Sequence, residues 1–448
     1  MSEPRERYKR IIKLLFSTIM VLGLGSIYAY VWIEYYNKSV IQLGMGFYRR
    51  GNWMIVLLYC ILLMFFFNTY GGFKVGHLKF GNLLYSQILS TIFTNIFTYF
   101  QIALIDKRFV NPAYMFIMTI CDMMFIISWT ILFHKFYKLI FPPRKMLLIS
   151  GDKSDYHLLE KMNKRDDKYQ ICKIINCCVG IEILQTEIMN YDGVIIGDMP
   201  SHERNWIVKY CFKESIRSYS VPKISDILLR SSDEMNLFDS PLLLSRNIEL
   251  TIEQHFFKRC LDIVISLIGI ILCSPIFLFI IIGIKLSDGG PAFYTQTRLT
   301  LNGKKFKIFK FRTMIQNAEK LSGPKLAEEE DERIFPFGKF LRTVRMDELP
   351  QLFNILKGDM SVVGPRPERP ELAEQIIKDI PEFEYRLKVK AGLTGYAQVY
   401  GKYNTTSYDK LKLDLTYIRN YSFLLDIKMI IMTPKILFMR ESTEGVRQ

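Results

Sequence analysis

The sequence has few of the residues that mark a metal centre or a disulfide-linked fold. Its 448 residues include only five histidines, which argues against a histidine-rich metal site. The eight cysteines form no Cys-x-x-Cys pair, and the adjacent Cys177 and Cys178 have no histidine nearby. This usage predicts reduced thiols in a protein that faces the cytoplasm.

A fingerprint for dinucleotide binding is also missing. The turn after the first expected strand reads Gly151-Asp152-Lys153-Ser154-Asp155, whereas close approach of a backbone to a pyrophosphate needs Gly-x-Gly-x-x-Gly. We therefore expect no bound dinucleotide. We also expect no helical Tyr-x-x-x-Lys pair in this region, and these two absences disfavour a nucleotide-sugar dehydratase or epimerase.

Hydrophobic residues are abundant instead. They make up half of the chain although 23% of the residues are charged. The two values fit together if apolar residues are concentrated in membrane spans and charges in separate domains. The formal net charge of +15 suits nucleic acid, or anionic lipid headgroups together with an anionic substrate. Because several spans are present, we favour the lipid bilayer and expect no nucleic-acid partner.

Residues 1–143 are predicted to form a membrane domain of four helices. The apolar segments lie at about Ile11–Ile33, Trp53–Phe67, Leu83–Ile105 and Tyr114–Phe141. Three exceed the roughly 20 residues that cross a bilayer core, and the second is slightly short. The first has no small-residue cleavage site after it, which predicts an anchor and not a signal peptide. Basic residues before the first and after the fourth segment predict that both ends are cytoplasmic.

Residues 144–250 have the pattern of an α/β domain. Strands expected at Met146–Gly151 and Gly193–Gly197 alternate with helices expected at His157–Met162 and Trp206–Phe212. Such alternation is typical of a parallel sheet of Rossmann type. Because the glycine fingerprint is absent, we predict a regulatory or oligomerisation role without a cofactor.

Residues 251–448 begin with an apolar run, Ile263–Ile284, that a proline interrupts. Ser274 and Pro275 lie at its centre. Proline removes a helical hydrogen bond and clashes with the carbonyl of Ile271, and the Ser274 hydroxyl is able to satisfy the backbone group that is released.

Charges flank this run on both sides. Lys258, Arg259 and Asp262 precede it, and Lys285 follows it. Charge at both ends and a central proline fit a helix that enters and leaves the membrane by one face, over about residues 258–286. On these two features alone, a kinked fifth span is supported equally well.

Two adjacent carboxylates, Asp347 and Glu348, are the strongest candidates for chemistry. The apolar residues of Leu349–Leu356 recur at helical spacing, which predicts a short helix that begins near Asp347, with Pro350 tolerated in its first turn. A purely structural role as an N-cap is the alternative. The two roles are compatible, because a helix N-terminus would keep Asp347 ionised and attract a phosphate.

Such a pair suits a reaction at a magnesium-bound phosphate. A carboxylate can attack the sugar-bearing phosphorus of a nucleotide-diphosphate sugar, and a lipid phosphate can then attack the acyl phosphate. Mg²⁺ takes only one or two protein carboxylates, so Glu348 is sufficient as its main ligand. Arg342, and Arg366 in a rigid Gly-Pro-Arg-Pro run, are the expected phosphate clamps.

These motifs resemble the bacterial sugar transferase family, the polyprenyl-phosphate hexose-1-phosphate transferases. The likeness lies in Met346–Leu352, Asp359–Glu368, Lys310–Met314 and the interrupted apolar helix, and the four-span N-terminal half matches the larger members. It implies that Asp347 is the nucleophile and Glu348 the magnesium ligand. It also favours the re-entrant helix, and it implies further substrate contacts from Lys310, Arg312, Arg298 and Gln351.

The fold that the resemblance implies is a four-helix transmembrane bundle, a central Rossmann-like domain and a C-terminal α/β catalytic domain with a re-entrant membrane helix and interfacial helices. The implied reaction moves a sugar-1-phosphate from a UDP-sugar to undecaprenyl phosphate, releases UMP and initiates an exopolysaccharide, capsule or O-antigen. It would take place on the cytoplasmic face of the bacterial inner membrane.

An alternative is a membrane-anchored scaffold or regulator of polysaccharide assembly with a degenerate catalytic half. It is disfavoured because the two carboxylates and both arginines are present. The sugar is left open, since one loop change in a pocket can alter it. The oligomeric state, including a homo-oligomer, is left open as well.

Three stretches of the C-terminal part carry further expectations. Thr300 stands where the family usually has glycine, so the turn after Arg298 is expected to differ. The loop Lys390–Val399 is assigned to nucleotide or sugar recognition. The amphipathic stretches Glu371–Leu387 and Leu411–Met439 fit interfacial helices and core-covering helices equally well.

Overall fold

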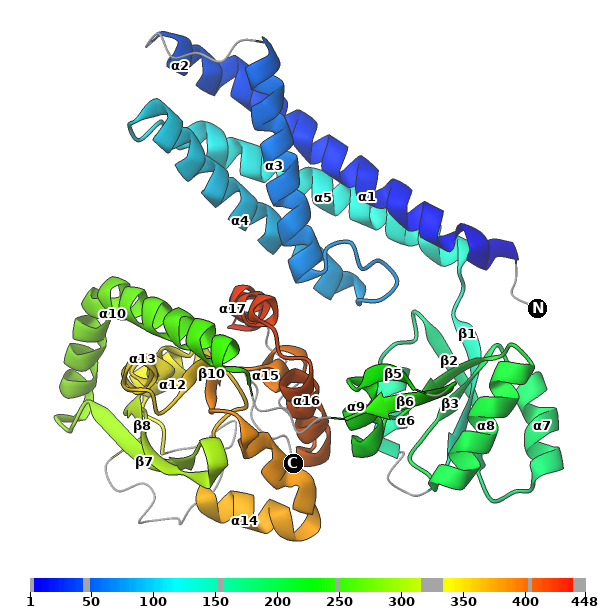
Figure 1. Cartoon of the computed structure of the whole chain (residues 1–448). Helices are drawn as coiled ribbons and strands as arrows, with labels where there is room; N and C mark the ends of the chain where they lie inside the picture. Colours follow the sequence, from blue (N-terminus) through cyan, green and yellow to red (C-terminus); the bar gives the residue numbers. More distant parts are fainter. Residues whose placement is uncertain are drawn as a thin grey trace. The chain divides into compact units, whose positions relative to one another are not determined.

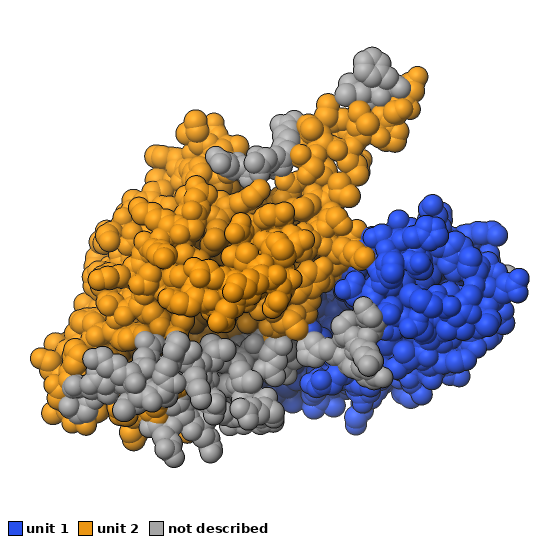
Figure 2. Space-filling view, turned by 90° about the horizontal axis from the view of Figure 1, so that it is seen from below, with its two compact units in different colours: residues 1–221 blue, residues 222–448 orange. Residues whose placement is uncertain are grey.

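The computed structural model describes residues 4–42, 49–151, 156–237, 239–245, 250–315, 333–401 and 405–437. The chain divides into two compact units, residues 1–221 and residues 222–448, which Figure 2 colours separately. Helix α9 (Ile224–Arg230) and the hairpin of β5 (Asp233–Leu237) and β6 (Ser240–Leu244) precede residue 250 but are part of the second unit.

Long apolar helices form the first part of unit 1 (Figure 1). They are α1 (Pro4–Val31), α3 (Arg49–Tyr70), α4 (Phe80–Asp106) and α5 (Ala113–Ile140), with a π-helical turn at Trp32–Tyr36 and the short α2 (Asn37–Gln42) after α1. Helix α3 has 22 residues and is longer than the apolar segment Trp53–Phe67 expected from the sequence, because the helix continues through polar residues at both ends of that segment. At 1.5 Å per residue it reaches about 33 Å, long enough to cross a bilayer core.

The apolar character of these helices agrees with the sequence prediction. Among the described residues, five helices are long and apolar enough to cross a membrane, namely these four and α10 (Ile252–Asp288). Their length and composition indicate a membrane protein.

Polar side chains line the inner face of α4. Asn95 accepts a hydrogen bond from Tyr59 Oη at 3.1 Å and donates to Asp122 Oδ2 at 2.9 Å. Asn95 and Asp122 are buried among the apolar side chains that join α1, α3, α4 and α5. Hydrogen bonds between helices at this depth hold the helices in register where apolar contacts alone are unspecific.

A parallel sheet completes unit 1. Its strands are β1 (Arg144–Ser150), β2 (Tyr169–Asn176), β3 (Gly193–Ile196) and β4 (Arg217–Ser220), in the order β2-β1-β3-β4 with every pair parallel. The expected parallel α/β domain is therefore present. The order matches the flavodoxin-like winding of doubly wound sheets and not the 3-2-1-4 order of dinucleotide-binding halves.

Helices cover both faces of this sheet. Helix α6 (Tyr156–Asn163) packs on one face, and α7 (Ile181–Met189) and α8 (Ser201–Lys213) pack on the other (Figure 1). The turn after Gly151, on which the missing glycine fingerprint falls, lies outside the described residues. Two Tyr-x-x-x-Lys spacings, Tyr169 to Lys173 and Tyr219 to Lys223, are present, but their tyrosines lie on strands β2 and β4 and not on a helix.

The interrupted apolar run of unit 2 is a single long helix. Helix α10 has 37 residues with Pro275 inside, and Figure 1 shows it bending sharply part-way along. The Ser274 hydroxyl donates to the carbonyl of Ile271 at 2.8 Å, the acceptor that proline leaves without its helical donor. This hydrogen bond confirms the role predicted for Ser274.

The rest of unit 2 surrounds a second apolar core. An antiparallel hairpin, β7 (Phe293–Leu299) and β8 (Lys305–Phe311), is followed by α12 (Pro336–Thr343), the 3₁₀ turn η4 (Met346–Glu348) and α13 (Gln351–Lys357). Then come β9 (Ser361–Val363), α14 (Pro370–Asp379), η5 (Pro381–Lys388), β10 (Gly392–Thr394), α15 (Tyr396–Tyr400), α16 (Ser407–Arg419) and α17 (Phe423–Leu437).

The two amphipathic stretches of the sequence each divide into two helical elements. One forms α14 and η5, and the other forms α16 and α17. Helix α16 buries Leu411, Leu415 and Ile418 in the core of unit 2, and α17 buries Met429 in the same core. Their inward faces therefore have the core-covering role that was one of the two alternatives.

Charged side chains attach the beginning of α10 to this core. Lys258 Nζ donates to Asp426 Oδ2 at 2.7 Å, to Val363 O at 2.9 Å and to Tyr417 Oη at 3.0 Å. Asp262 Oδ1 accepts from Ser361 Oγ at 2.9 Å and from the Val362 amide at 2.8 Å. Because these groups are buried and have partners, they join the long helix firmly to strand β9.

We predict that Lys258→Met destabilises unit 2 by about 3–5 kcal/mol, because Asp426 would remain buried without its cation. The measurement is the thermal unfolding midpoint of the detergent-purified protein. Lys258→Met combined with Asp426→Leu is the matched control and should recover most of the loss. A single variant as stable as the parent would contradict the structural role of this pair.

Candidate active site

The site is built where strand β8 meets the segment that leads into α13. Asn354 of α13 accepts a hydrogen bond from the Phe309 amide at 2.9 Å and donates to Lys307 O at 2.8 Å. These two hydrogen bonds take the place of the bonds that a neighbouring strand would form with this edge of β8. Since Asn354 is fully buried, this contact fixes β8 beside α13.

Glu348 is the centre of the charge cluster. Its Oε1 accepts from Lys310 Nζ and from Arg366 Nη2, both at 2.7 Å, and its Oε2 lies 3.4 Å from Arg366 Nη1. The residue is buried, at 9% exposed. Burial would raise the pKa of Glu348, but Arg366 and Lys310 outweigh that effect and hold the pKa well below its ordinary value. Glu348 is therefore an anion.

Asp347 stands beside it in η4. The preceding Arg345 has φ of +53°, a left-handed conformation that a non-glycine residue adopts only at some cost. This residue turns the chain sharply between α12 and η4. The expected helix is thus a 3₁₀ turn over Met346–Glu348, followed by an α-helix that begins only at Gln351.

The ionisation of Asp347 differs from the sequence expectation. We expected a helix N-terminus to favour its charged form. In the structure, burial and the neighbouring Glu348 anion raise the pKa of Asp347 to about 6, while Lys310, Arg342 and Arg366 act in the opposite direction. Burial and a like charge outweigh the cations because Glu348 already engages two of them.

The structure brings together five of the predicted site residues. Arg342, at the end of α12, donates from Nε to Thr313 Oγ1 at 2.8 Å. With Lys310 and Arg366 it is one of the cations whose charge acts on Asp347. The carboxylates therefore face three basic groups from β8, α12 and the Gly-Pro-Arg-Pro run.

Three other predicted residues have different surroundings. Arg312 is buried and donates from Nε to Pro291 O at 2.6 Å. Arg298 donates from Nη1 to Pro367 O at 3.2 Å and from Nη2 to Gln296 at 2.8 Å. Gln351 is buried at the first residue of α13. Both guanidinium groups thus bind backbone carbonyls, and the substrate contacts expected of these residues stay predictions.

The glycine-rich loop lies against the Gly-Pro-Arg-Pro run. A Cβ on Gly392 would come within 2.1 Å of the Gly364 amide, and a Cβ on Gly364 within 2.3 Å of Lys390 O. The amide of Gly392 donates to Pro365 O at 2.9 Å, and that of Gly364 to Thr394 O at 2.8 Å. Glycine is required at both positions because two backbones meet there without room for side chains.

The turn after Arg298 accommodates threonine. Thr300 is in an extended conformation, so it needs no glycine, and its hydroxyl donates to Asp359 O at 2.9 Å. The left-handed residues of this turn are Asn302 and Gly303. The departure from the family pattern therefore falls on a residue whose backbone conformation does not require glycine.

A cavity of about 400 Å³ opens beside this turn, within the range of small-molecule pockets. It is lined by Thr300, Leu301, Asn302, Lys304, Phe306, Gly358, Asp359 and Lys390. Lys390 is the residue of the predicted recognition loop that reaches it. Phe306 and Lys310 are four positions apart on β8, or about 13 Å along the strand, so the cavity is separate from the carboxylates.

Sequence reasoning missed residues that hold this site together. Asn354 interrupts an apolar helical run, and such an interruption was the available signal. Arg386, which donates from Nη2 to Arg366 O at 3.0 Å, and its partner Asp414 lie in amphipathic stretches where charge is ordinary. Nothing in the pattern distinguishes them from solvent-exposed residues.

A buried anionic carboxylate, a second carboxylate of raised pKa and three cations lie together here, and groups of this kind suit group transfer at phosphate. Comparison with known proteins agrees. Residues 253–440 match the bacterial sugar transferase family, and this part of the chain belongs to it.

Three relatives illustrate the match. A UDP-N-acetylgalactosamine-undecaprenyl-phosphate N-acetylgalactosaminephosphotransferase of Aeromonas hydrophila is 41% identical over 181 residues, 40% of this chain and 43% of the relative. A UDP-glucose:undecaprenyl-phosphate glucose-1-phosphate transferase of Klebsiella pneumoniae is 40% identical over 221 residues, 46% and 45% of the two chains. An undecaprenyl-phosphate galactose phosphotransferase of Salmonella typhimurium is 34% identical over 247 residues, 51% of each. The chain thus spans about half the length of these curated relatives.

We predict that kcat/KM falls about tenfold per pH unit below a midpoint near pH 6, because protonation of Asp347 removes a reactive anion. The groups that set this midpoint are Glu348, Lys310, Arg342 and Arg366. The measurement is a pH–rate profile at low substrate concentration. Lys310→Gln should move the acid limb to higher pH, since the cation favours the charged form. An acid limb with its midpoint at about pH 4, the ordinary pKa of an aspartate, would contradict the raised pKa of Asp347.

Proposed function

We propose that this chain transfers a sugar-1-phosphate from a UDP-sugar to undecaprenyl phosphate and releases UMP, thereby initiating a surface glycan. The observation that carries the proposal is the pair of adjacent carboxylates with different environments. Glu348 is held as an anion by Lys310 and Arg366, and Asp347 beside it has a pKa of about 6. The family match supports the same reaction class.

The reaction has two displacements at one phosphorus. First, a carboxylate oxygen of Asp347 attacks the sugar-bearing phosphorus, and the bond from that phosphorus to the bridging oxygen breaks as UMP leaves. Second, an oxygen of the lipid phosphate attacks the same phosphorus and the Asp347 carboxylate leaves. The first step stores the phospho-sugar as an acyl phosphate, and the second forms the lipid pyrophosphate. Protons need not move at either phosphorus.

Cations of the site oppose the charge that develops on the phosphate oxygens. Arg342 and Arg366 can each present two N–H groups to a phosphate, and Lys310 adds a point charge. Arg366 is well suited because its side chain contacts Glu348 and yet is 46% exposed, so it can reach a substrate. Positioning and charge neutralisation are the main contributions to phosphoryl transfer.

Magnesium fits the donors of this site. Among the described residues, no three His, Cys, Asp or Glu side chains gather, so a metal ion would rely on Glu348, Asp347 and substrate oxygens. Mg²⁺ commonly binds in that way, through one or two carboxylates plus phosphates. Glu348 is the expected ligand because it is anionic, and its Oε2 has only the longer contact to Arg366. The ion would neutralise pyrophosphate charge.

We further propose that α1, α3, α4 and α5 cross the bacterial inner membrane as a four-helix bundle, with the catalytic part at the cytoplasmic face. Within α10, the bend at Ser274-Pro275 supports a helix that enters and leaves by the same face. Both ends of α10 then lie in the compartment that holds the nucleotide sugar. The flavodoxin-like sheet is proposed to serve regulation or assembly.

The donor sugar is a separate question. The three relatives are named for N-acetylgalactosamine, glucose and galactose. A panel of UDP-sugars with detection of released UMP would identify the donor used by this chain. UMP release from no UDP-sugar, with undecaprenyl phosphate present, would favour the scaffold alternative.

We predict that Asp347→Asn lowers turnover by about four orders of magnitude, because the amide keeps the shape of the side chain but is not a nucleophile. The measurement is UMP release by the detergent-purified protein. Asp379→Asn, the same chemical change at an exposed residue of α14, is the matched control and should leave turnover unchanged.

Initial-rate kinetics complete this test. A covalent intermediate requires a ping-pong pattern, in which UMP leaves before the lipid binds. The covalent mechanism would be wrong if the Asp347→Asn variant stays active and the reaction needs both substrates bound at once. Asp347 would then have only a structural or metal-binding role.

We predict that a cysteine at Ser287, after the bend of α10, is protected from a membrane-impermeant maleimide in intact cells and is labelled after permeabilisation. The reason is that a re-entrant helix returns to the cytoplasmic side. Phe109→Cys, between α4 and α5, is the control on the opposite face and should be labelled from outside. The other reactive cysteines are removed beforehand.

Substitution of the proline extends this experiment. Pro275→Ala restores the helical hydrogen bond and should convert part of the population to a span, so that labelling at Ser287 increases. Efficient labelling of the parent at this position from outside would contradict the re-entrant arrangement.

A further inference from the structure

The backbone that carries Arg366 is held by two side chains and one backbone amide that play no part in the reaction described above. The carbonyl of Arg366 accepts a hydrogen bond from Arg386 Nη2 at 3.0 Å. The next carbonyl, of Pro367, accepts from Arg298 Nη1 at 3.2 Å, and the carbonyl of Glu368 accepts from the Leu299 amide at 3.0 Å. Three consecutive carbonyls are therefore fixed from outside the turn.

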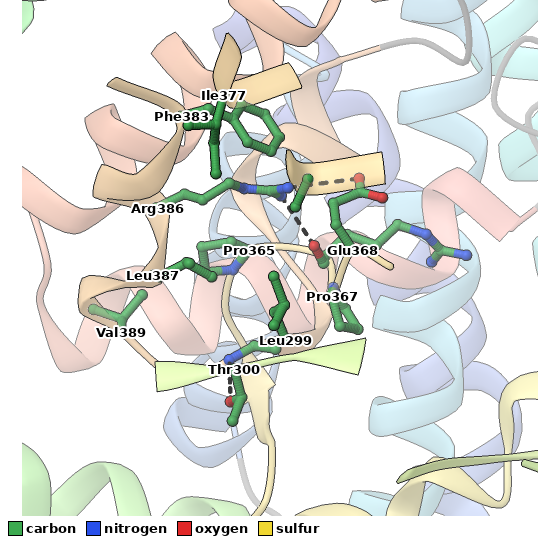
Figure 3. Close-up of a pocket in the computed structure, with 13 residues that line it drawn as sticks. Leu299, Thr300, Pro365, Pro367, Glu368, Ile377, Phe383, Arg386, Leu387 and Val389 are labelled. Carbon is green, nitrogen blue, oxygen red and sulfur yellow. Dashed lines mark hydrogen bonds and ion pairs between the residues drawn. The ribbon is translucent and has the colours of Figure 1, made fainter. Parts of the chain in front are cut away.

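Arg386 is itself rigidly held. Its Nε and Nη2 lie 3.0 Å and 2.8 Å from Asp414 Oδ2, and its Nη1 lies 3.5 Å from Glu368 Oε1. The side chains of Arg386 and Asp414 are 5% and 1% exposed. In Figure 3, Arg386 points from η5 toward Glu368. A buried, multiply bonded guanidinium of this kind has little conformational freedom.

The surroundings of Arg386 exclude a second substrate pocket. The cavity lined by Pro365, Phe383, Arg386 and Leu387 measures about 10 Å³, the space of roughly one water molecule (Figure 3). A nucleotide or sugar needs several hundred Å³. The side chains around Arg386 are therefore closely packed against the turn that carries Arg366.

We propose that Arg386, held by Asp414, is a positioning residue that fixes the Arg366 backbone so that the Arg366 guanidinium meets Glu348 and the substrate phosphate. This role rests on the proposed function. It explains why a buried ion pair is placed behind the turn, although such pairs are commonly no more stabilising than an apolar pair of similar size.

Asp414 belongs to α16, and Arg386 to η5, so the Arg366 turn depends on residues that follow Arg366 by 20 positions or more. A displacement of about 1 Å at a phosphate clamp is enough to lower a rate by about a hundredfold. Misplacement of the turn should therefore affect transition-state binding more strongly than folding.

A double-mutant cycle tests this role. Arg386→Lys keeps the positive charge but loses the fork that contacts Asp414 and the Arg366 carbonyl together. We expect it to lower kcat/KM for UMP release by about tenfold to a hundredfold in the parent. In an Arg366→Lys background the same change should have an effect of less than about twofold, because the clamp it positions is already lost. Rates are expressed per folded protein.

Arg419→Lys is the matched control. Arg419 lies on α16, as Asp414 does. Its side chain donates to Ser231 at 2.8 Å and to Leu228 O at 3.3 Å, so it supports α9 and not the Arg366 turn. It should change kcat/KM by the same small factor in both backgrounds. If Arg386→Lys fails to fold, Asp414→Asn enters the cycle in its place.

The outcomes separate this role from the proposed function. Equal effects of Arg386→Lys in the two backgrounds, or a folded Arg386→Lys variant with unchanged kcat/KM, would overturn the positioning role while the transferase activity stands. A parent protein that releases no UMP from any UDP-sugar would overturn the proposed function and this role together.

Discussion

Glu348 is a buried carboxylate that stays ionised because two cations from different segments meet it. Lys310 comes from β8, and Arg366 comes from the turn after β9. An isolated charge at this depth would be protonated or would destabilise the fold, so both segments must be held within hydrogen-bonding distance. Asn354 holds β8 against α13, and Arg386 holds the turn. The architecture of the site follows from this need for two cations.

Helix α10 and the site share one support. Lys258 and Asp262, near the beginning of α10, bind the backbone of β9, and β9 leads directly into the Arg366 turn. Strand β9 is in turn paired with β10 in parallel register. A change in the seating of α10 would therefore be transmitted to Arg366 through a few hydrogen bonds. This arrangement places Asp347 and Glu348 at a fixed position relative to a helix that is long and apolar enough to cross a bilayer.

Local patterns predicted the elements of the fold well, because apolar runs and alternation depend on neighbouring residues. The long helices, strands β1 and β3 and the Ser274 hydrogen bond to Ile271 are examples. Contacts between distant segments were not predictable in this way. The carbonyl partners of Arg298 and Arg312 and the pairing of Arg386 with Asp414 depend on tertiary packing. The raised pKa of Asp347 likewise depends on burial, which a helix N-terminus in the sequence pattern did not reveal.

The central claim is that Asp347 forms a covalent bond to phosphorus, and mass spectrometry of the digested protein tests it most directly. The protein is mixed with a UDP-sugar in the absence of the lipid acceptor, quenched rapidly and digested. We predict a mass increase of one phospho-sugar on the peptide that contains Asp347, which disappears when undecaprenyl phosphate is added before the quench. Turnover with no adduct on Asp347 at any quench time, or an adduct on another residue, would contradict the assignment.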